Sequence, residues 1–261
     1  MESGPKHQPA KAEGGPGKEY YEHYARRNLF DIAGLLADTR DSPNLLKDIA
    51  THPQLHIGLL GSATPLNMIN ISGWLTSIGR KDLTKDQLCV IDKSEIAIEK
   101  HKNHLDQEGF PEGLGVDLVQ GDITAMPFAS GSLEIVIADY TGNFISEKEK
   151  LELFFKEAHR VMSHTSVFFL RYSYSLNFLR TTARTVDLVH TVDSVDIPSV
   201  LPAQESIGEY YLFPHHVWCT AMKKAGFALE GSIMGKGELN TGTLLFSADQ
   251  SRKLFKAEEQ E

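Results

Sequence analysis

The stretch QLCVIDKSEIAIEKHKNH (residues 87–104) contains the pattern that decides the fold. Residues 87–91 form a continuous apolar run of strand length, Asp92 follows directly, and Ser94 is a suitable N-cap for a helix. Because the run is continuous rather than alternating, it predicts a strand that is covered on both faces. Strands of this kind are typical of parallel sheets wrapped by helices.

The same alternation extends in both directions along the chain. Strands are expected at 55–60, 87–91, 116–120, 133–138, 165–171, 227–234 and 242–247. Helices are expected at 19–39, 66–79, 94–108, 146–162, 176–190 and 215–224, with Ser146 as the N-cap of the fourth. In that helix the apolar positions Leu151, Phe154, Phe155, Ala158 and Val161 form one stripe. Strand–helix alternation over five units predicts a doubly wound α/β sheet.

Length and composition exclude several classes of protein. The 261 residues allow one large domain or two small ones, and 41% are hydrophobic, as in ordinary globular proteins. A net charge of −9 argues against a nucleic-acid or anionic-membrane surface. No apolar stretch approaches the roughly 18 residues of a membrane span. Two cysteines make neither a disulfide framework nor a structural zinc site, so a reducing, cytoplasmic location is expected.

Polar residues follow four of the expected strands. They are Gly61–Pro65, Asp92, Asp122 and Asp139–Thr141. In doubly wound sheets, ligands bind outside the carboxyl ends of the strands. Carboxylates at these places can accept hydrogen bonds from a ribose diol, help to read an adenine edge, or receive an ammonium group. Any one of them can equally be a turn former or a helix cap, and only together do they favour a ligand site.

Four stretches resemble the class I S-adenosylmethionine-dependent methyltransferases. GDITAMPFASGSLEIVIADY (121–140) is similar to their adenine loop and fourth strand, and LFFKEAHRVMSHTSVFFL (153–170) to the next helix and strand. VIDKSEIAIEKHKNH (90–104) and MKKAGFALEG (222–231) resemble the second-strand segment and a late turn. The resemblance covers about residues 50–250. It implies a Rossmann-like, mostly parallel seven-stranded sheet with helices on both faces and an antiparallel last strand.

The resemblance also implies a cofactor, S-adenosyl-L-methionine, and the residues that hold it. Asp92 would bind the ribose hydroxyls, Asp122 and Ile123 the adenine, and Asp139 with Tyr140 the methionine part and the reacting methyl group. The expected cofactor-binding residues are Gly61, Ser62, Ala63, Asp92, Lys93, Asp122, Ile123, Asp139, Tyr140 and, from an N-terminal helical lid, Tyr21.

The loop after the first strand departs from the family pattern. Leu59 stands where an acidic residue is usual, and Ala63 and Pro65 replace two glycines. This leaves a second hypothesis open: a non-catalytic partner subunit, or a protein that uses the cofactor site for another reaction. A third, a nicotinamide oxidoreductase, ranks last because the Gly-x-Gly-x-x-Gly motif is absent.

Features on the acceptor side favour a small molecule. Asp139-Tyr-Thr-Gly follows the fourth strand in place of an Asn-Pro-Pro-Tyr motif, so a metabolite is expected as methyl acceptor. His215 and Tyr174 are the candidate catalytic residues, His215 as a general base. The alternative for His215 is a cap or a surface residue. No metal site is expected because His215 and His216 lack a third ligand. The sequence leaves the oligomeric state open, a homodimer included.

Finally, the chain divides into regions of different character. A disordered tail is expected at 1–18, the helical lid at 19–50, the Rossmann-like domain at 51–250 with a helical insertion at about 175–205, and a polar tail at 251–261. The first residues lack the apolar segment of a secretory signal. His101 and His104 are expected to face solvent without a role, and Cys89 to be an inert part of the core.

Overall fold

The structure, a computed structural model, describes residues 36, 43–62, 64–110, 113–174, 184–187, 209–227, 232–234 and 240–247. Tyr21, Ala63, both tails and most of the expected insertion lie outside these ranges. Among the described residues, no helix is both long and apolar enough to cross a membrane.

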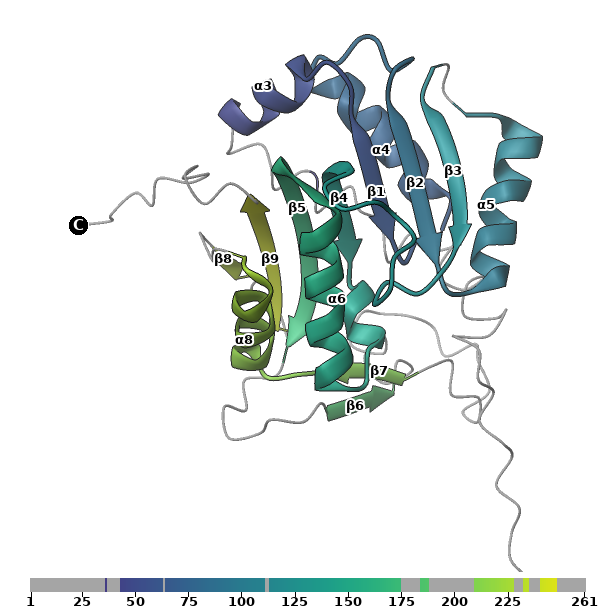
Figure 1. The fold of residues 1–261 in the computed structure, drawn as a ribbon. Coiled ribbons are helices and arrows are strands. Elements are labelled where there is room, and N and C mark those ends of the chain that lie inside the picture. The colour runs from purple at the N-terminus through teal and green to yellow at the C-terminus, as the bar shows by residue number, and fades with distance from the viewer. Residues whose placement is uncertain are drawn as a thin grey trace, which may run out of the picture.

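The main helices and strands between residues 56 and 174 follow the order expected from the sequence, whereas the elements at 43–51, 184–187 and 209–212 depart from it (Figure 1). The helices are α3 (Pro43–Thr51), α4 (Leu66–Ser77), α5 (Glu95–Glu108), α6 (Lys148–Val161) and α8 (His215–Ala225), with a short 3₁₀ helix, η2, at Thr141–Phe144. The strands are β1 (His56–Leu60), β2 (Gln87–Asp92), β3 (Gly115–Gln120), β4 (Leu133–Asp139), β5 (Met162–Tyr174), β6 (Arg184–Asp187), β7 (Glu209–Leu212), β8 (Ser232–Met234) and β9 (Asn240–Ser247).

The main sheet has the strand order β3-β2-β1-β4-β5-β9-β8. The neighbours from β3 to β5 run parallel, and β9 is antiparallel to both β5 and β8. The order reverses between β1 and β4, which makes their carboxyl ends the topological switch point where ligands of such sheets bind. The predicted α/β fold with a parallel sheet is confirmed.

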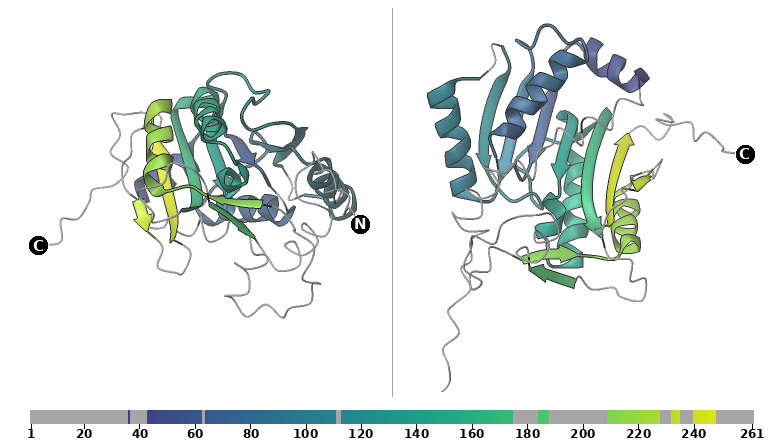
Figure 2. Two further views of the ribbon diagram at one scale, coloured as in Figure 1. Left: turned by 90° about the horizontal axis from the view of Figure 1, so that it is seen from below. Right: turned by 180° about the vertical axis from the view of Figure 1, so that it is seen from behind.

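Alternate residues of the central strands belong to two different cores. The α4-side core is the cluster that contains the buried residues of α3 and α4, and the α6-side core contains those of α6 and α8. In β4, Ile135 and Ile137 belong to the former, whereas Val136 and Ala138 belong to the latter. Both faces are thus covered by helices (Figures 1 and 2), which explains why the strands are continuous apolar runs.

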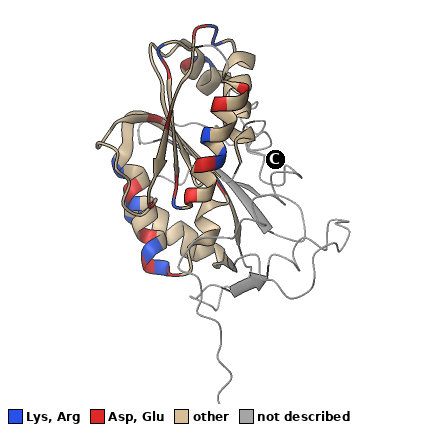
Figure 3. Ribbon diagram, turned by 90° about the vertical axis from the view of Figure 1, so that its right-hand side faces the viewer, with Lys and Arg blue, Asp and Glu red and all other residues tan. Residues whose placement is uncertain are grey.

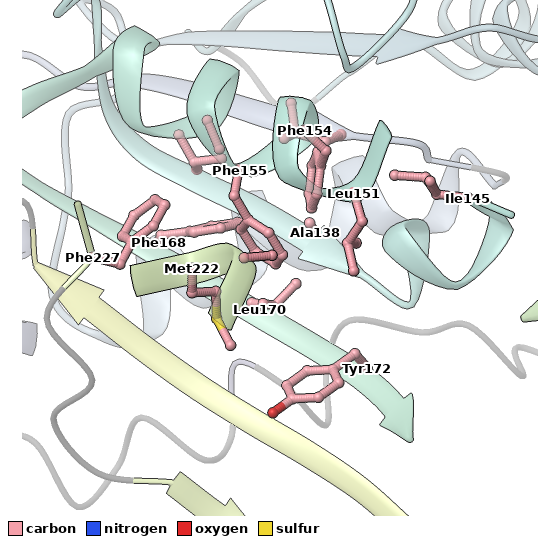
Figure 4. Close-up of a cluster of buried hydrophobic side chains, with 14 of the residues drawn as sticks. Ala138, Ile145, Leu151, Phe154, Phe155, Phe168, Leu170, Tyr172, Met222 and Phe227 are labelled. Atoms are coloured by element: carbon pink, nitrogen blue, oxygen red, sulfur yellow. The ribbon is translucent and has the colours of Figure 1, made fainter. Parts of the chain in front are cut away.

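The α6-side core is built from aromatic rings (Figure 4). The predicted stripe of α6 is fully buried: Leu151, Phe154, Phe155, Ala158 and Val161. The ring of Phe155 meets that of Trp218 edge to face, with centroids 6.0 Å apart, and Phe227 at 6.2 Å. Such pairs stabilise a core beyond the area they bury, so α6 and α8 are fixed against the sheet beside the ends of β4 and β5.

Two local predictions are wrong. Ser146 does not cap α6, because the extended residue before the helix is Glu147 and the structure shows no side-chain cap there. Glu147 instead pairs with Lys150. In the expected insertion helix, residues 184–187 form strand β6, which pairs with β7. The β-branched pair Thr185-Val186 lies opposite two tyrosines, a combination that suits strands better than helices.

A buried ion pair joins the elements at the amino end of the sheet. Arg80 donates to both carboxylate oxygens of Asp86, which also accepts the Leu55 amide at 2.9 Å. The other terminal nitrogen of Arg80 donates to the carbonyls of Ile49 and His52, near the end of α3. This network holds α3 where β1 begins. The described part of the expected lid therefore lies at the opposite edge from the strands' carboxyl ends (Figure 1).

Candidate functional site

The ends of β1, β2, β3 and β4 are joined directly by hydrogen bonds. The Gly61 amide donates to the Ile91 carbonyl at 2.7 Å, and the Gly121 amide to the Asp92 carbonyl at 3.0 Å. On the other side, Thr141 Oγ1 donates to the Leu60 carbonyl at 2.6 Å. The left panel of Figure 2 views the molecule from this edge. The first loop, Asp92, Asp122 and Asp139 thus follow adjacent strands of one sheet.

The loop after β1 turns sharply at Gly61, whose φ is +65°. A Cβ at this position would lie 2.3 Å from Thr141 Cγ2, so only glycine fits. The next residue, Ser62, is 1% exposed. Pro65 adopts φ −58° and ψ −24° and opens α4, so it is compatible with the turn. Gly61 and Pro65 thus adopt the conformations that a turn from β1 into α4 requires.

Asp92 is the last residue of β2 and is almost buried, with 8% of its surface exposed. Its Oδ1 accepts the Ser94 amide at 2.8 Å, and Ser94 in turn caps α5 by accepting the Ala97 amide. Burial raises the pKa of Asp92 to about 6, although the amides of Ser94 and Lys93 oppose this rise. The fold therefore holds a costly carboxylate at the predicted ribose position, able to accept further hydrogen bonds.

Asp122, at the end of β3, is half-exposed and forms a local turn. Its Oδ1 accepts both the amide and the hydroxyl of Thr124, at 2.8 and 2.7 Å. Partial burial acts to raise the pKa of Asp122, but the Thr124 hydrogen bonds and the charge of Lys93 lower it overall. Lys93 Nζ lies 4.0 Å from Asp122 Oδ2, which links the ends of β2 and β3. Ile123 packs against the α6-side core.

The segment after Asp122 is clamped by a pair on α6 that was not singled out from the sequence for this role. Glu157 accepts the Met126 amide at 2.9 Å, and Arg160 donates to the carbonyls of Met126 and Phe128 at 2.9 and 2.8 Å. The two side chains also pair with each other. Their i,i+3 spacing in the stretch that resembles the methyltransferases was the available signal.

Asp139 lies at the end of β4, as expected, but it is not isolated. Both of its carboxylate oxygens accept hydrogen bonds from Arg171, its neighbour in register on β5, at 2.6 and 2.7 Å. Tyr140 follows with φ +54°, an unusual conformation for an aromatic residue, and its ring lies 4.9 Å from the Arg171 guanidinium carbon. The predicted site thus includes an arginine that neutralises Asp139.

After β4, Asn143 brings β7 to the end of β5. Its amide nitrogen donates to the carbonyls of Ser173 and Tyr211, both at 2.8 Å, and its oxygen accepts the Ser173 amide. Gly142 lets Trp218 approach, because a Cβ there would lie 2.8 Å from the indole ring. The start of α8 is therefore held beside η2.

His215 begins α8 and is half-buried. Its Nδ1 lies 3.1 Å from the hydroxyl of the buried Tyr172, and its Nε2 lies 3.4 Å from Cys219 Sγ. Burial lowers the pKa of His215, and His216 lowers it further, which favours the neutral ring. Tyr174 is the last residue of β5, but its side chain lies outside the described part of the structure, as do Tyr21 and Ala63.

The prediction that His101 faces solvent is wrong. His101 is 0% exposed and contacts Ser62 in the first loop. It lies on the same face of α5 as Ser94 and Ala97. Because these residues are small or polar, the sequence shows no apolar stripe that would identify this face as buried. His104 is half-buried and lies near Glu108. Cys89 is half-buried in β2.

The comparisons with known proteins agree with this geometry. Residues 72–170 match a protein family described as a methyltransferase domain. This match covers less than half of the 261-residue chain. The match runs from α4 into β5, so it includes Asp92, Asp122 and Asp139 but not the altered loop after β1. No curated protein matches the chain.

Solved structures share the fold at low sequence identity. An S-adenosylmethionine-dependent methyltransferase from Clostridium acetobutylicum gives a TM-score of 0.55 at 12% identity, covering 88% of this chain and 97% of its own. One from Methanosarcina mazei gives 0.54 at 13%, covering 76% and 94%. The Burkholderia thailandensis 1,6-didemethyltoxoflavin-N1-methyltransferase, with 1,6-didemethyltoxoflavin and S-adenosylhomocysteine bound, gives 0.53 at 10%, covering 87% and 83%. The chain therefore shares its fold with these enzymes.

Proposed function

We propose that this protein is an S-adenosylmethionine-dependent methyltransferase that acts on a small molecule. The observation that carries the proposal is the nearly buried carboxylate of Asp92, which stands beside the first loop at the switch point of the sheet. Burying an acid without a basic partner costs free energy, and two ribose hydroxyls would repay part of it by donating to the carboxylate. The methyltransferase domain match and the named enzymes that share the fold support this choice of cofactor.

The residues present fit a nucleoside cofactor at this edge. Asp92 offers acceptors for the ribose, and the turn at Gly61 brings the backbone close to it. The Glu157–Arg160 pair fixes the segment after Asp122 that would border the adenine. When bound, S-adenosylmethionine supplies a methyl group on a sulfonium, and the protein's task is to align the acceptor in line with it and to exclude water.

We place the acceptor near Tyr140, Tyr174 and His215. The neutral imidazole of His215 can take a proton from an acceptor once its contacts to Tyr172 and Cys219 rearrange. The Asp139–Arg171 pair and the strained Tyr140 would form the wall between the two halves of the site. A small acceptor is favoured by the residues after β4, Tyr140-Thr-Gly-Asn, which carry no nucleotide-binding or amide-binding motif.

Charge and cysteine chemistry support a metabolic role in a reducing, cytoplasmic setting. The net charge is −9, and in the view of Figure 3 basic and acidic residues are interspersed along the described helices. That pattern does not favour nucleic acid as a partner. Cys89 and Cys219 are both free.

The second candidate is a methyltransferase-fold protein that has lost the transfer reaction. One observation favours it: Leu59, in place of the usual acid, is 1% exposed and belongs to the α4-side core, so it offers nothing to a cofactor. The two candidates differ in whether the chain binds the cofactor at all.

Isothermal titration with S-adenosylhomocysteine separates them. We expect the wild-type protein to bind, and Asp92→Asn to bind at least about tenfold more weakly because charge-assisted hydrogen bonds are lost. Asp117→Asn, an exposed carboxylate on β3, is the matched control and should bind as the wild type does. No binding by the wild-type protein at millimolar ligand would reject the enzyme; equal binding by Asp92→Asn would mean that the ribose lies elsewhere.

A further inference from the structure

His101 ties helix α5 to the loop after β1. It lies two turns into α5 and is completely buried. Its Nδ1 is 2.7 Å from the Ala97 carbonyl, and its Nε2 is 3.0 Å from Ser62 Oγ. The contact spans 39 residues of sequence and joins the two elements that follow β1 and β2.

The chemistry of the partners assigns the protons. A carbonyl oxygen only accepts, so Nδ1 carries the proton toward Ala97. Burial lowers the pKa of His101 to about 4, so the ring is neutral near pH 7 and Nε2 is an acceptor. Ser62 has one hydroxyl proton and two acceptors within reach, His101 Nε2 and the Thr64 carbonyl at 3.1 Å. The hydroxyl donates to one of these acceptors at a time, and donation to His101 Nε2 ties the loop to α5.

The same helix also holds Asp92. The Ser94 amide donates to Asp92, Ser94 Oγ accepts the Ala97 amide, and the Ala97 carbonyl accepts from His101. A continuous series of hydrogen bonds thus runs from the Asp92 carboxylate through two turns of α5 to Ser62. The carboxylate and the first loop are positioned against each other by one rigid element.

The position of the loop after β1 depends on the contact between Ser62 and His101. Between Gly61 and Pro65 only Gly61 is a glycine, and Thr141 and the Ile91 carbonyl hold that residue. Ser62, the next residue, contacts His101 on α5. Without this contact Ser62 would keep its hydrogen bond to the Thr64 carbonyl but would lose its tie to α5, the helix that also holds Asp92.

We propose that His101 is a positioning residue for cofactor binding, which acts through Ser62 to hold the first loop in place. The inference rests on the proposed function, because it assumes that the loop contacts the nucleoside. It assigns His101 no contact with the cofactor and no part in proton transfer. A residue that only fills the core would instead affect stability without a specific effect on affinity.

The test measures S-adenosylhomocysteine affinity by isothermal titration and the unfolding midpoint of the same samples. His101→Leu keeps an apolar side chain in the buried position but removes both hydrogen bonds, and Ser62→Ala removes the partner. Each should weaken binding about tenfold. The double variant should be no weaker than either single one, because both remove the same contact. His101→Gln places an amide nitrogen near Ser62 Oγ and should restore most of the affinity.

His104→Leu, on the same helix, is the matched control and should bind as the wild type does. Failure of the wild-type protein to bind would remove the proposed function itself. Binding by the wild type with unchanged affinity of His101→Leu would overturn only the positioning role. That role would also be overturned if His101→Gln remains as weak as His101→Leu, or if the losses in Ser62→Ala and His101→Leu add, since either result would show that the contact does not carry the effect.

Discussion

Two buried aspartates lie at opposite ends of β2 and have different hydrogen-bond partners. Asp86, directly before the strand, is 2% exposed and accepts hydrogen bonds from the Arg80 guanidinium and the Leu55 amide. Asp92, at the carboxyl end, is 8% exposed, and within the described part of the chain its hydrogen bonds come from backbone amides. The first charge is neutralised by an arginine, whereas the proposed function assigns the second to a ligand.

This difference distinguishes the amino end of the sheet, which is held by an ion pair, from the carboxyl end, where we propose the ligand site. At the amino end, the Arg80–Asp86 pair fixes α3 to the beginning of β1. At the carboxyl end, the residues around Asp92 satisfy the backbone of the loops but leave the carboxylate with a raised pKa. Stability given up at such a place is typical of binding sites.

Breaking the pair at the amino end should have the largest effect. Arg80→Leu leaves Asp86 buried without its partner, so the free energy of unfolding should fall by about 3–5 kcal/mol. Urea denaturation followed by circular dichroism measures it. Lys81→Leu, the exposed neighbour, should change little. A loss below about 1 kcal/mol in Arg80→Leu would mean that the amino end does not depend on this pair.

Removing the charge of Asp92 at the carboxyl end should instead increase the free energy of unfolding. Burial raises the folded-state pKa of Asp92 to about 6 from its usual 3.8. Well below pH 3.8 the carboxyl is protonated in both states. Between pH 3.8 and about 6 the unfolded chain ionises while the buried carboxyl stays protonated, so stability falls over this range and is constant above it. Asp92→Asn should therefore be more stable than the wild type by about 2–3 kcal/mol at pH 7.

That gain should shrink to about 0.5 kcal/mol near pH 4, where the folded carboxyl is neutral and the unfolded one is only partly ionised. Chemical denaturation of both proteins at pH 4 and pH 7 makes the comparison, with Asp117→Asn as the exposed control. Equal stabilities of Asp92→Asn and the wild type at pH 7 would show that Asp92 costs the fold nothing.

The same titration should govern ligand binding. If the ribose hydroxyls donate to ionised Asp92, affinity for S-adenosylhomocysteine should be constant above about pH 7 and fall about tenfold per pH unit below pH 6. In Asp92→Asn, binding should be weaker but flat across the same range. Titration calorimetry between pH 5 and pH 8 measures both proteins. If the affinity of the wild-type protein did not change with pH, Asp92 would not contact the ligand.

The smallest effect is expected from changing the Glu157–Arg160 pair on α6. Arg160→Met removes the hydrogen bonds to Met126 and Phe128, which should cost about 1–2 kcal/mol of stability and weaken S-adenosylhomocysteine binding about threefold. Amide exchange at Met126 should become faster. Lys156→Met, exposed on the same helix, serves as the control. Unchanged exchange at Met126 would show that the segment is held by other contacts.

Much of the fold could be predicted because its signals are local. The apolar runs that became β1, β2 and β4, the Ser94 cap and the buried stripe of α6 each depend on neighbouring residues alone. Strand β6 was missed because its partner, β7, lies more than twenty residues away in the sequence. Pairing across that distance decides the structure of residues 184–187, and local propensity cannot show it.

The candidate site could be predicted only in outline for the same reason. Asp92 and Asp122 were found because strand ends are visible in the sequence. The Arg171 partner of Asp139 comes from a different strand and is visible only in the sheet register. His101 was assigned to solvent because it stands among lysines, and its burial depends on the packing of α5 over the first loop.

The most direct test of the proposed cofactor site is the structure of the complex with S-adenosylhomocysteine. We expect the ribose hydroxyls to lie about 2.6–3.0 Å from the Asp92 carboxylate oxygens, with the Gly61–Thr64 backbone alongside the ligand. A nucleoside bound at any other edge of the sheet, with Asp92 bonded only to its own backbone, would contradict the central claim.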